Sequence, residues 1–164
     1  MFTDELKRDA ERLLAELRQR KLKITTAESC TGGLIVALLT EIPASSDVVD
    51  RGFVTYSNDA KSEMLGIPLS LITSFGAVSR EVAIAMAEGA LAHARADVSV
   101  AVTGVAGPGG GTPAKPVGLV HVAAARRDGT TQHRECRFGA VSRSEIRERT
   151  VAAALTLALN CVVN

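Results

Sequence analysis

The chain has 164 residues, 46% of them apolar, which is the size and composition of one domain with a sizeable core. Its formal net charge at pH 7 is +1, so no strong electrostatic field favours nucleic acid or an acidic membrane as a partner. A small-molecule partner is the expectation that remains.

The cysteines and histidines give no sign of a metal site or of disulfides. Cys30, Cys136 and Cys161 are odd in number and widely spaced, and no signal peptide or membrane-spanning apolar run accompanies them. A reduced, cytoplasmic protein is therefore expected. The sequence has no C-x-x-C, H-x-x-x-H or H-E-x-x-H motif, which would put two metal ligands on the same helix or loop. A metal could therefore be bound only by ligands from separate elements. We expect neither a metal site nor a cofactor.

The first part of the chain predicts a helix, a strand and a second helix. Residues 3–20 place leucine and alanine side chains on one stripe at helical spacing, which predicts an amphipathic helix. Residues 23–27 are expected to be extended, and residues 31–40 to form a buried helix that begins at Gly32-Gly33. Ser29 would then lie at a strand-to-helix turn.

The middle of the chain predicts one strand followed by three helices. The strand covers residues 52–56, and the helices begin at the Ser57-Asn58-Asp59 cap, at Pro68, and after the Ser79 cap, the last of them ending near Ala94. Lys61 would lie about one turn into the first of these helices.

The last part predicts three strands and a final helix. Residues 98–102 are suited to a central strand, and residues 117–125 and 131–138 flank an Asp128-Gly129 turn, as in an antiparallel hairpin. Ser142 and Glu145 have the spacing of a capping box before the final helix. The order of elements predicts an α/β fold, a three-layer α/β/α sandwich around a mixed, mostly parallel sheet with an antiparallel hairpin.

Ser29 is the candidate nucleophile. Because it follows a strand and precedes a helix, free amide groups and the positive end of the helix dipole are expected to point toward its hydroxyl. The glycines after it would let a substrate carbonyl approach the backbone, as an oxyanion site requires. The alternative is that Ser29 or Thr31 only caps the helix. Cys30 is a rival nucleophile, although its aliphatic neighbours favour a buried structural cysteine.

Tyr56 and Lys61 are the candidate proton acceptors for Ser29. The turn lacks the G-x-S-x-G pattern, and no lysine follows Ser29 by three residues, so a base has to come from elsewhere in the fold. A lysine in a partly apolar pocket has a lowered pKa, and a tyrosine hydroxyl can relay or orient a proton. The ordinary alternatives are an exposed lysine and a tyrosine at the edge of the core.

The glycine-rich segment from Gly104 to Gly111 is suited to cradle a phosphate with its backbone N–H groups, helped by Thr103, Thr112 and Lys115. It matches neither the P-loop nor the Rossmann pattern. A surface turn is the alternative, but a loop that directly follows a buried strand is where open α/β sheets bind ligands.

These segments together resemble the C-terminal domain of the competence-damage protein CinA, the nicotinamide-nucleotide amidase family. The resemblance runs from about Leu22 to the end of the last helix. Its motifs are Thr26-Ala27-Glu28-Ser29-Cys30-Thr31-Gly32-Gly33, Gly52-Phe53-Val54-Thr55-Tyr56-Ser57-Asn58-Asp59-Ala60-Lys61, Gly76-Ala77-Val78-Ser79, Thr103 to Thr112, and Lys115-Pro116-Val117-Gly118.

The resemblance implies deamidation of nicotinamide mononucleotide to nicotinate mononucleotide and ammonia, with Ser29, Tyr56 and Lys61 as the catalytic residues. The substrate-binding residues expected for the nucleotide are Thr31, Gly32, Gly33, Thr103, Gly104, Gly107, Gly109, Gly110, Gly111, Lys115 and Arg143. Within this set, the phosphate is expected on the glycine loop with Lys115 or Arg143. Where the family often has Gly-Asp-Arg, this chain has Val141-Ser142-Arg143.

Two other functions are consistent with the same residues. One is a non-catalytic nucleotide-binding or interaction module, and the other is an amidase for a different phosphorylated amide. Many family members carry a further N-terminal domain, whereas this chain starts at the helix before the amidase part, so residues 1–164 are expected to form a single amidase domain. Alanine-rich helices such as residues 80–94 also favour self-association into a homo-oligomer.

Overall fold

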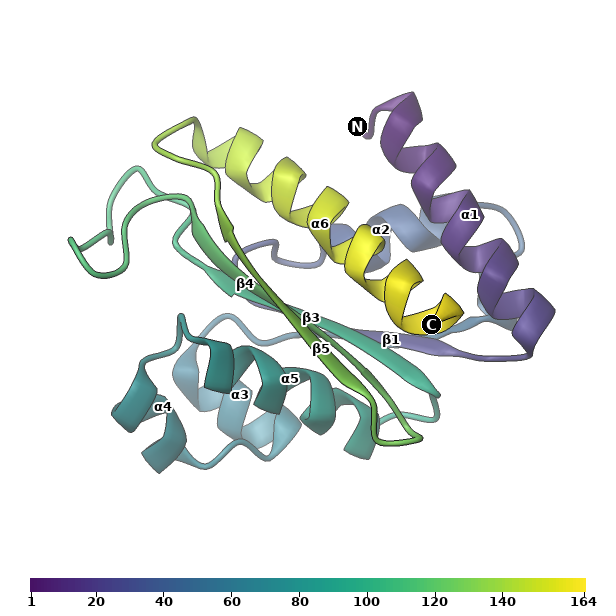
Figure 1. Ribbon diagram of the computed structural model, residues 1–164, viewed down its shortest axis with the longest axis horizontal. Helices are drawn as coiled ribbons and strands as arrows, with labels where there is room; N and C mark the ends of the chain where they lie inside the picture. Colours follow the sequence, from purple (N-terminus) through teal and green to yellow (C-terminus); the bar gives the residue numbers. More distant parts are fainter.

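The computed structural model describes residues 1–164 and contains one five-stranded mixed sheet with helices on both faces (Figure 1). The strand order is β2-β1-β3-β4-β5. The strands are β1 (Ile24–Glu28), β2 (Val49–Val54), β3 (Val98–Gly104), β4 (Leu119–Arg126) and β5 (Thr131–Arg137). Strand β1 is parallel to both β2 and β3, whereas β4 is antiparallel to β3 and β5. The predicted mixed sheet with an antiparallel hairpin is confirmed.

The helices form an outer layer on each face of the sheet, which confirms the predicted three-layer sandwich (Figure 1). One layer consists of α1 (Asp4–Arg20), α2 (Leu34–Glu41) and α6 (Arg143–Val163), and the other of α3 (Asn58–Leu65), α4 (Leu69–Phe75) and α5 (Arg80–Ala92). A short 3-10 turn, η1 (Ser45–Asp47), precedes β2. None of the helices combines the length and the apolar character needed to cross a membrane.

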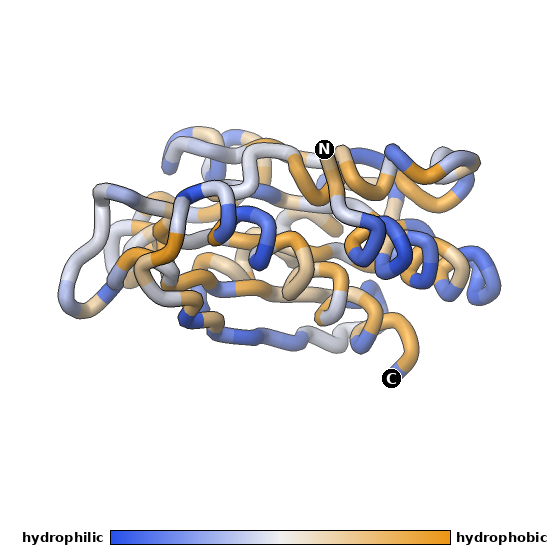
Figure 2. The backbone as a smooth tube through the Cα atoms, turned by 90° about the horizontal axis from the view of Figure 1, so that it is seen from above, coloured by the Kyte–Doolittle hydropathy of each residue, from blue (hydrophilic) through white to orange (hydrophobic).

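The sheet divides the apolar core into two parts. Figure 2, which looks down on the layer of α1 and α6, shows apolar stretches alternating with polar ones along the chain. Val98, Val100 and Val102 of β3 face the larger part under α1 and α6, which is built mainly from Leu, Ile and Val. Ala101 of β3 faces the smaller part, which is rich in alanine and packs against α5. Side chains alternate along a strand, so one strand serves both layers.

The three predicted caps, Ser57, Ser79 and Ser142, are found where helices begin, and Thr3 caps the first helix in the same way. The hydroxyl oxygens of Thr3, Ser57, Ser79 and Ser142 each accept the backbone N–H of the residue three positions later, at 3.0–3.2 Å. These contacts satisfy N–H groups that the first helical turn leaves free. Four helix starts were therefore readable from short-range sequence rules.

The predicted start of the second helix at residue 31 was wrong, because α2 begins at Leu34. Gly32 and Gly33 have φ angles of +60° and +100°, a left-handed conformation that ends the turn after Ser29 before the helix can begin. Ser29 is thus separated from α2 by a turn instead of lying directly at its N-terminus.

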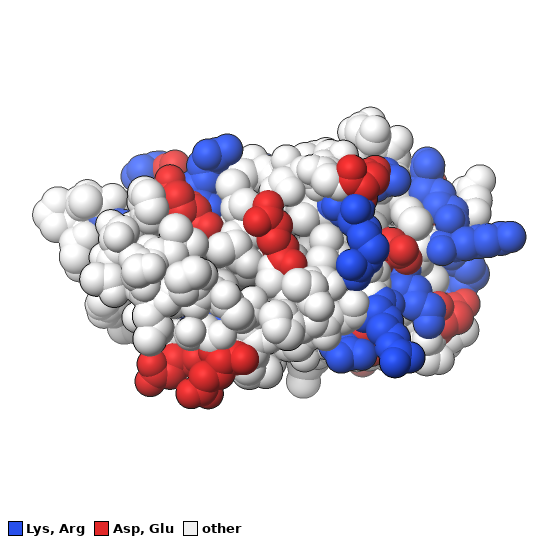
Figure 3. Space-filling model, turned by 90° about the horizontal axis from the view of Figure 1, so that it is seen from below, with Lys and Arg blue, Asp and Glu red and all other residues white.

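The charged side chains are unevenly placed on the face formed by α3, α4 and α5. Figure 3 shows Lys and Arg gathered toward the end of this face where the β4–β5 turn lies. Pairing of Val98 with Arg126 and of Gly104 with Val120 puts that turn at the opposite end of the sheet from Gly104. Because β1 runs parallel to β3, Ser29 lies at the Gly104 end, away from the basic region.

Candidate active site

Ser29 opens into a cavity of about 210 Å³ at the carboxyl ends of β1 and β3. The lining residues are Ser29, Cys30, Tyr56, Asn58, Lys61, Ala77, Val78, Thr103, Gly104, Ala106 and Arg143. The three predicted catalytic residues, together with Thr103, Gly104 and Arg143, are therefore brought together. The edge where parallel strands end is the usual ligand position in open α/β sheets.

Lys61 is buried against Ser29. Its side chain is 1% exposed, and Nζ lies 3.0 Å from Ser29 Oγ and 3.0 Å from the carbonyl oxygen of Thr55. The carbonyl of Tyr56 lies 3.4 Å away. Burial lowers the pKa of the Lys61 amine, because a charged ammonium loses its hydration there. No carboxylate pairs with Lys61 to offset this lowering of its pKa.

Glu28, which the sequence reasoning did not select, organises the turn after Ser29. Its fully buried carboxylate accepts the backbone N–H groups of Gly33, Ile35 and Val36 at 2.9–3.1 Å. It also accepts the hydroxyl of Thr31. The expectation that helix amides point at the Ser29 hydroxyl is therefore wrong, since Glu28 occupies the first N–H groups of α2.

Arg147, which was also missed, holds the same turn from α6. Its Nε donates to the carbonyl of Cys30 at 3.1 Å, and one terminal nitrogen donates to the carbonyl of Thr31 at 2.9 Å. No local motif signals this contact, because the residues are 117 and 116 positions apart. The turn is thus fixed through its N–H groups by Glu28 and through its carbonyls by Arg147.

Tyr56 and Arg143 form the outer rim of the cavity. The Tyr56 phenol is largely exposed, and its oxygen accepts a hydrogen bond from Arg143 at 3.0 Å. Another nitrogen of Arg143 donates to the carbonyl of Gly107 at 2.8 Å. The hydroxyl of Tyr56 contacts neither Ser29 nor Lys61, and only its backbone carbonyl bonds to the Lys61 amine.

The glycine-rich loop contributes only its first part to the cavity. Thr103 and Gly104 line it, and the Thr103 hydroxyl donates to the carbonyl of Ala77 at 2.8 Å. Gly107 contacts the rim through Arg143. Residues 109–111 are exposed and lie outside the lining of the cavity, so the loop does not wrap around Ser29.

Four other predicted binding residues are not brought to the cavity. Thr31 is fully buried, and its hydroxyl donates a hydrogen bond to the carboxylate of Glu28. Gly32 and Gly33 form part of the turn but do not line the cavity. Lys115 donates to the carbonyl of Phe75 at 2.6 Å and lines a neighbouring cleft instead. Cavity residues that the sequence reasoning missed are Asn58, Ala77, Val78 and Ala106. Two of them belong to the Gly76-Ala77-Val78-Ser79 motif, which was a usable signal.

Cys30 is a poor nucleophile despite its position next to Ser29. Its side chain is buried, and burial raises the pKa of the thiol to about 12, so the thiolate is scarce at neutral pH. This favours the interpretation of Cys30 as a structural residue over the rival one.

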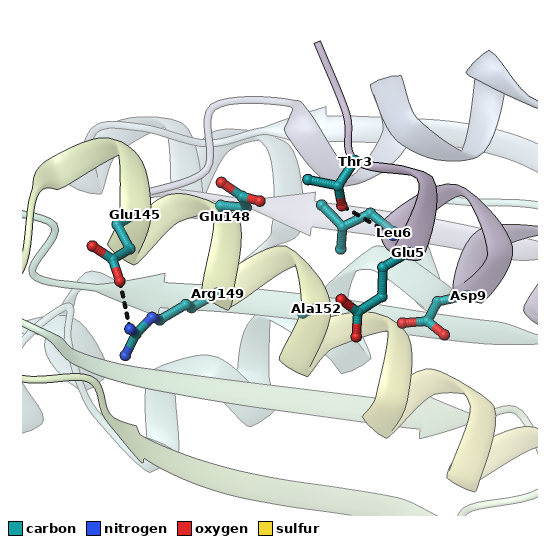
Figure 4. Close-up of a pocket in the computed structure, with 8 residues that line it drawn as sticks. All are labelled: Thr3, Glu5, Leu6, Asp9, Glu145, Glu148, Arg149 and Ala152. Carbon is teal, nitrogen blue, oxygen red and sulfur yellow. Dashed lines mark hydrogen bonds and ion pairs between the residues drawn. The ribbon is translucent and has the colours of Figure 1, made fainter.

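A larger cavity, of about 430 Å³, lies between α1 and α6 and contains none of the predicted site residues. Figure 4 shows Glu5, Asp9 and Glu148 around it, with Arg149 pointing to Glu145, to which it is hydrogen-bonded. It contains no cysteine, serine or lysine, and its one hydroxyl, that of Thr3, accepts the backbone N–H of Leu6 as the cap of α1. No three His, Cys, Asp or Glu side chains are grouped to hold a metal ion.

Comparison with known proteins identifies the family. The profile of the CinA C-terminal domain matches residues 6–162. A putative competence-damage inducible protein of Caldicellulosiruptor bescii is 48% identical over 86% of this chain, and a CinA-like protein of Akkermansia muciniphila is 55% identical over 73% of it. These matches cover 34% and 29% of the two relatives, so the chain spans about a third of their length.

Solved structures show the same fold. The competence/damage inducible protein CihA from Agrobacterium tumefaciens superposes with a TM-score of 0.94 at 54% identity, covering 98% of both chains. A CinA superfamily protein from Klebsiella pneumoniae gives a TM-score of 0.90 at 30% identity, covering 96% of this chain and 97% of the other.

Proposed function

Since the chain belongs to the CinA C-terminal domain family, we propose that it hydrolyses the carboxamide of nicotinamide mononucleotide, giving nicotinate mononucleotide and ammonia through Ser29. The observation that carries this proposal is the 3.0 Å contact between Lys61 Nζ and Ser29 Oγ inside a buried site. A neutral amine at that distance is a general base for a serine hydroxyl.

The reaction begins when Lys61 takes the proton of Ser29 and Oγ attacks the carboxamide carbon. A tetrahedral intermediate forms, with negative charge on the former carbonyl oxygen. Lys61 then gives its proton to the carboxamide nitrogen, so that neutral ammonia leaves and an acyl ester on Ser29 remains. Water, deprotonated by Lys61, attacks this ester, and the proton returns to Oγ as nicotinate mononucleotide departs.

The size of the cavity determines which part of the nucleotide it takes. Its volume of about 210 Å³ is below the roughly 300–1,000 Å³ of sites that enclose a whole drug-sized ligand. The pyridine carboxamide therefore enters, while the ribose phosphate stays at the rim. Arg143 and Tyr56 lie at that rim, and the guanidinium is the cation that the phosphate would meet. Lys115 lies outside this proposal, because it lines another cleft.

Ammonia release from nicotinamide mononucleotide by the purified chain tests the proposal. Ser29→Ala is expected to abolish ammonia release, because no other hydroxyl group is hydrogen-bonded to Lys61 Nζ. Ser70→Ala, at an exposed position on α4, is the matched control and should retain the wild-type rate. Binding of the nucleotide without turnover would contradict the proposal and favour a binding module. Turnover of another phosphorylated amide alone would leave an amidase with a different substrate.

A further inference from the structure

The turn after Ser29 leaves backbone donors free beside the nucleophile. The N–H groups of Cys30 and Thr31 donate to no other residue, whereas Gly32 N–H donates to the Ser29 carbonyl at 3.1 Å and Gly33 N–H to Glu28. Of the two free groups, only that of Cys30 belongs to a residue that lines the cavity. The N–H directly after a nucleophile is a common oxyanion donor in serine hydrolases.

A series of hydrogen bonds connects this free N–H to Arg147. The guanidinium donates to the Thr31 carbonyl at 2.9 Å, and the N–H at the other end of that peptide unit, on Gly32, donates to the Ser29 carbonyl at 3.1 Å. The N–H at the far end of the Ser29 peptide unit is that of Cys30. Hydrogen bonds in series polarise one another, so a cation at one end strengthens the donor at the other.

We propose that Arg147 is a positioning residue for the reaction: it holds the turn by its carbonyls and strengthens the Cys30 N–H as the donor to the developing oxyanion. This inference rests on the proposed function of Ser29. Arg147 touches neither the cavity nor Ser29 Oγ, and it acts only through the Cys30 and Thr31 carbonyls. Because Glu28 anchors the same turn independently, the turn keeps a second support when Arg147 is replaced.

Arg147→Met tests this role, with ammonia release as the first readout. Loss of a complete oxyanion donor costs about 100- to 1,000-fold in kcat, and here the donor is weakened but present, so a loss of about tenfold is expected. KM should stay within about twofold, since the charge on the oxygen develops only in the transition state. Arg147→Lys should recover part of kcat. Arg149→Met, an exposed arginine of the same helix that pairs with Glu145, should match wild type.

The rate at which a fluorophosphonate labels Ser29 is the second readout, because charge develops on the phosphonyl oxygen in the same place without any need for the nucleotide. Arg147→Met should slow labelling by a similar factor while its circular dichroism spectrum stays native. A loss confined to KM, unchanged kcat and labelling, or an equal loss in Arg149→Met would overturn the role of Arg147. If the fluorophosphonate labels Ser29 of the wild-type protein but no ammonia is released, the substrate proposal fails. The labelling rates of wild type and Arg147→Met then test the role of Arg147 by themselves. If wild type does not label at Ser29, both proposals fail.

Discussion

Lys61 and Ser29 are 32 residues apart in the chain, yet Lys61 Nζ lies 3.0 Å from Ser29 Oγ. Ser29 follows β1, and Lys61 lies on the helix that follows β2, so the parallel pairing of these two strands brings both residues to the same sheet edge. Burial of the amine lowers its pKa, and no carboxylate lies beside it to offset the lost hydration. This relationship supports the role of Lys61 as a base.

The first prediction concerns the pH dependence of kcat/KM for ammonia release. Above the lowered pKa of Lys61 the amine is neutral and accepts a proton, and below it the ammonium cannot, so activity should fall as the pH falls. The midpoint on the acid side is expected below the ordinary lysine value of 10.5. A profile that is flat, or whose midpoint is at or above that value, would show that Lys61 is not the base.

Lys61→Arg tests the same role by replacing the titratable amine with a permanently charged group. A guanidinium remains protonated at every accessible pH, so this variant should be inactive throughout the profile. Lys21→Arg, at an exposed position, is the control and should reproduce the wild-type curve.

The second prediction separates Ser29 from its neighbour Cys30. Because burial raises the pKa of the Cys30 thiol to about 12, iodoacetamide at neutral pH should inactivate the native protein only slowly. Cys30→Ala should keep kcat within a few-fold of wild type and lower the free energy of unfolding by roughly 1 kcal/mol, as a small core truncation does. Loss of activity in a folded Cys30→Ala protein would reopen the question of a thiol nucleophile.

The third prediction concerns Glu28 as the cap of α2. Glu28→Gln replaces one acceptor oxygen by an NH₂ group that meets backbone N–H donors, so the free energy of unfolding should fall by about 2–4 kcal/mol. Urea unfolding followed by circular dichroism measures the change. Glu88→Gln, at an exposed position on α5, should alter stability by less than about 0.5 kcal/mol. Equal stabilities for the two variants would refute the capping role.

Local sequence rules predicted most of the fold, because the interactions behind them span only a few residues. Each of four helix caps accepts the N–H of the residue three positions later, a spacing that can be recognised in the sequence. These caps are Thr3, Ser57, Ser79 and Ser142. Rules of this range failed at α2. Its cap is Glu28, which reaches N–H groups five to eight residues ahead across a glycine turn.

The sequence by itself determined the α/β class, the helix caps, the family motifs and the candidates Ser29, Tyr56 and Lys61. Only the tertiary structure decided that Lys61 touches Ser29, that the Tyr56 phenol pairs with Arg143, that Lys115 lies in another cleft, and that Arg147 holds the nucleophile turn. The reason is physical: local propensity acts over a few residues, whereas these contacts depend on how parallel strands align their ends and how α6 packs across them.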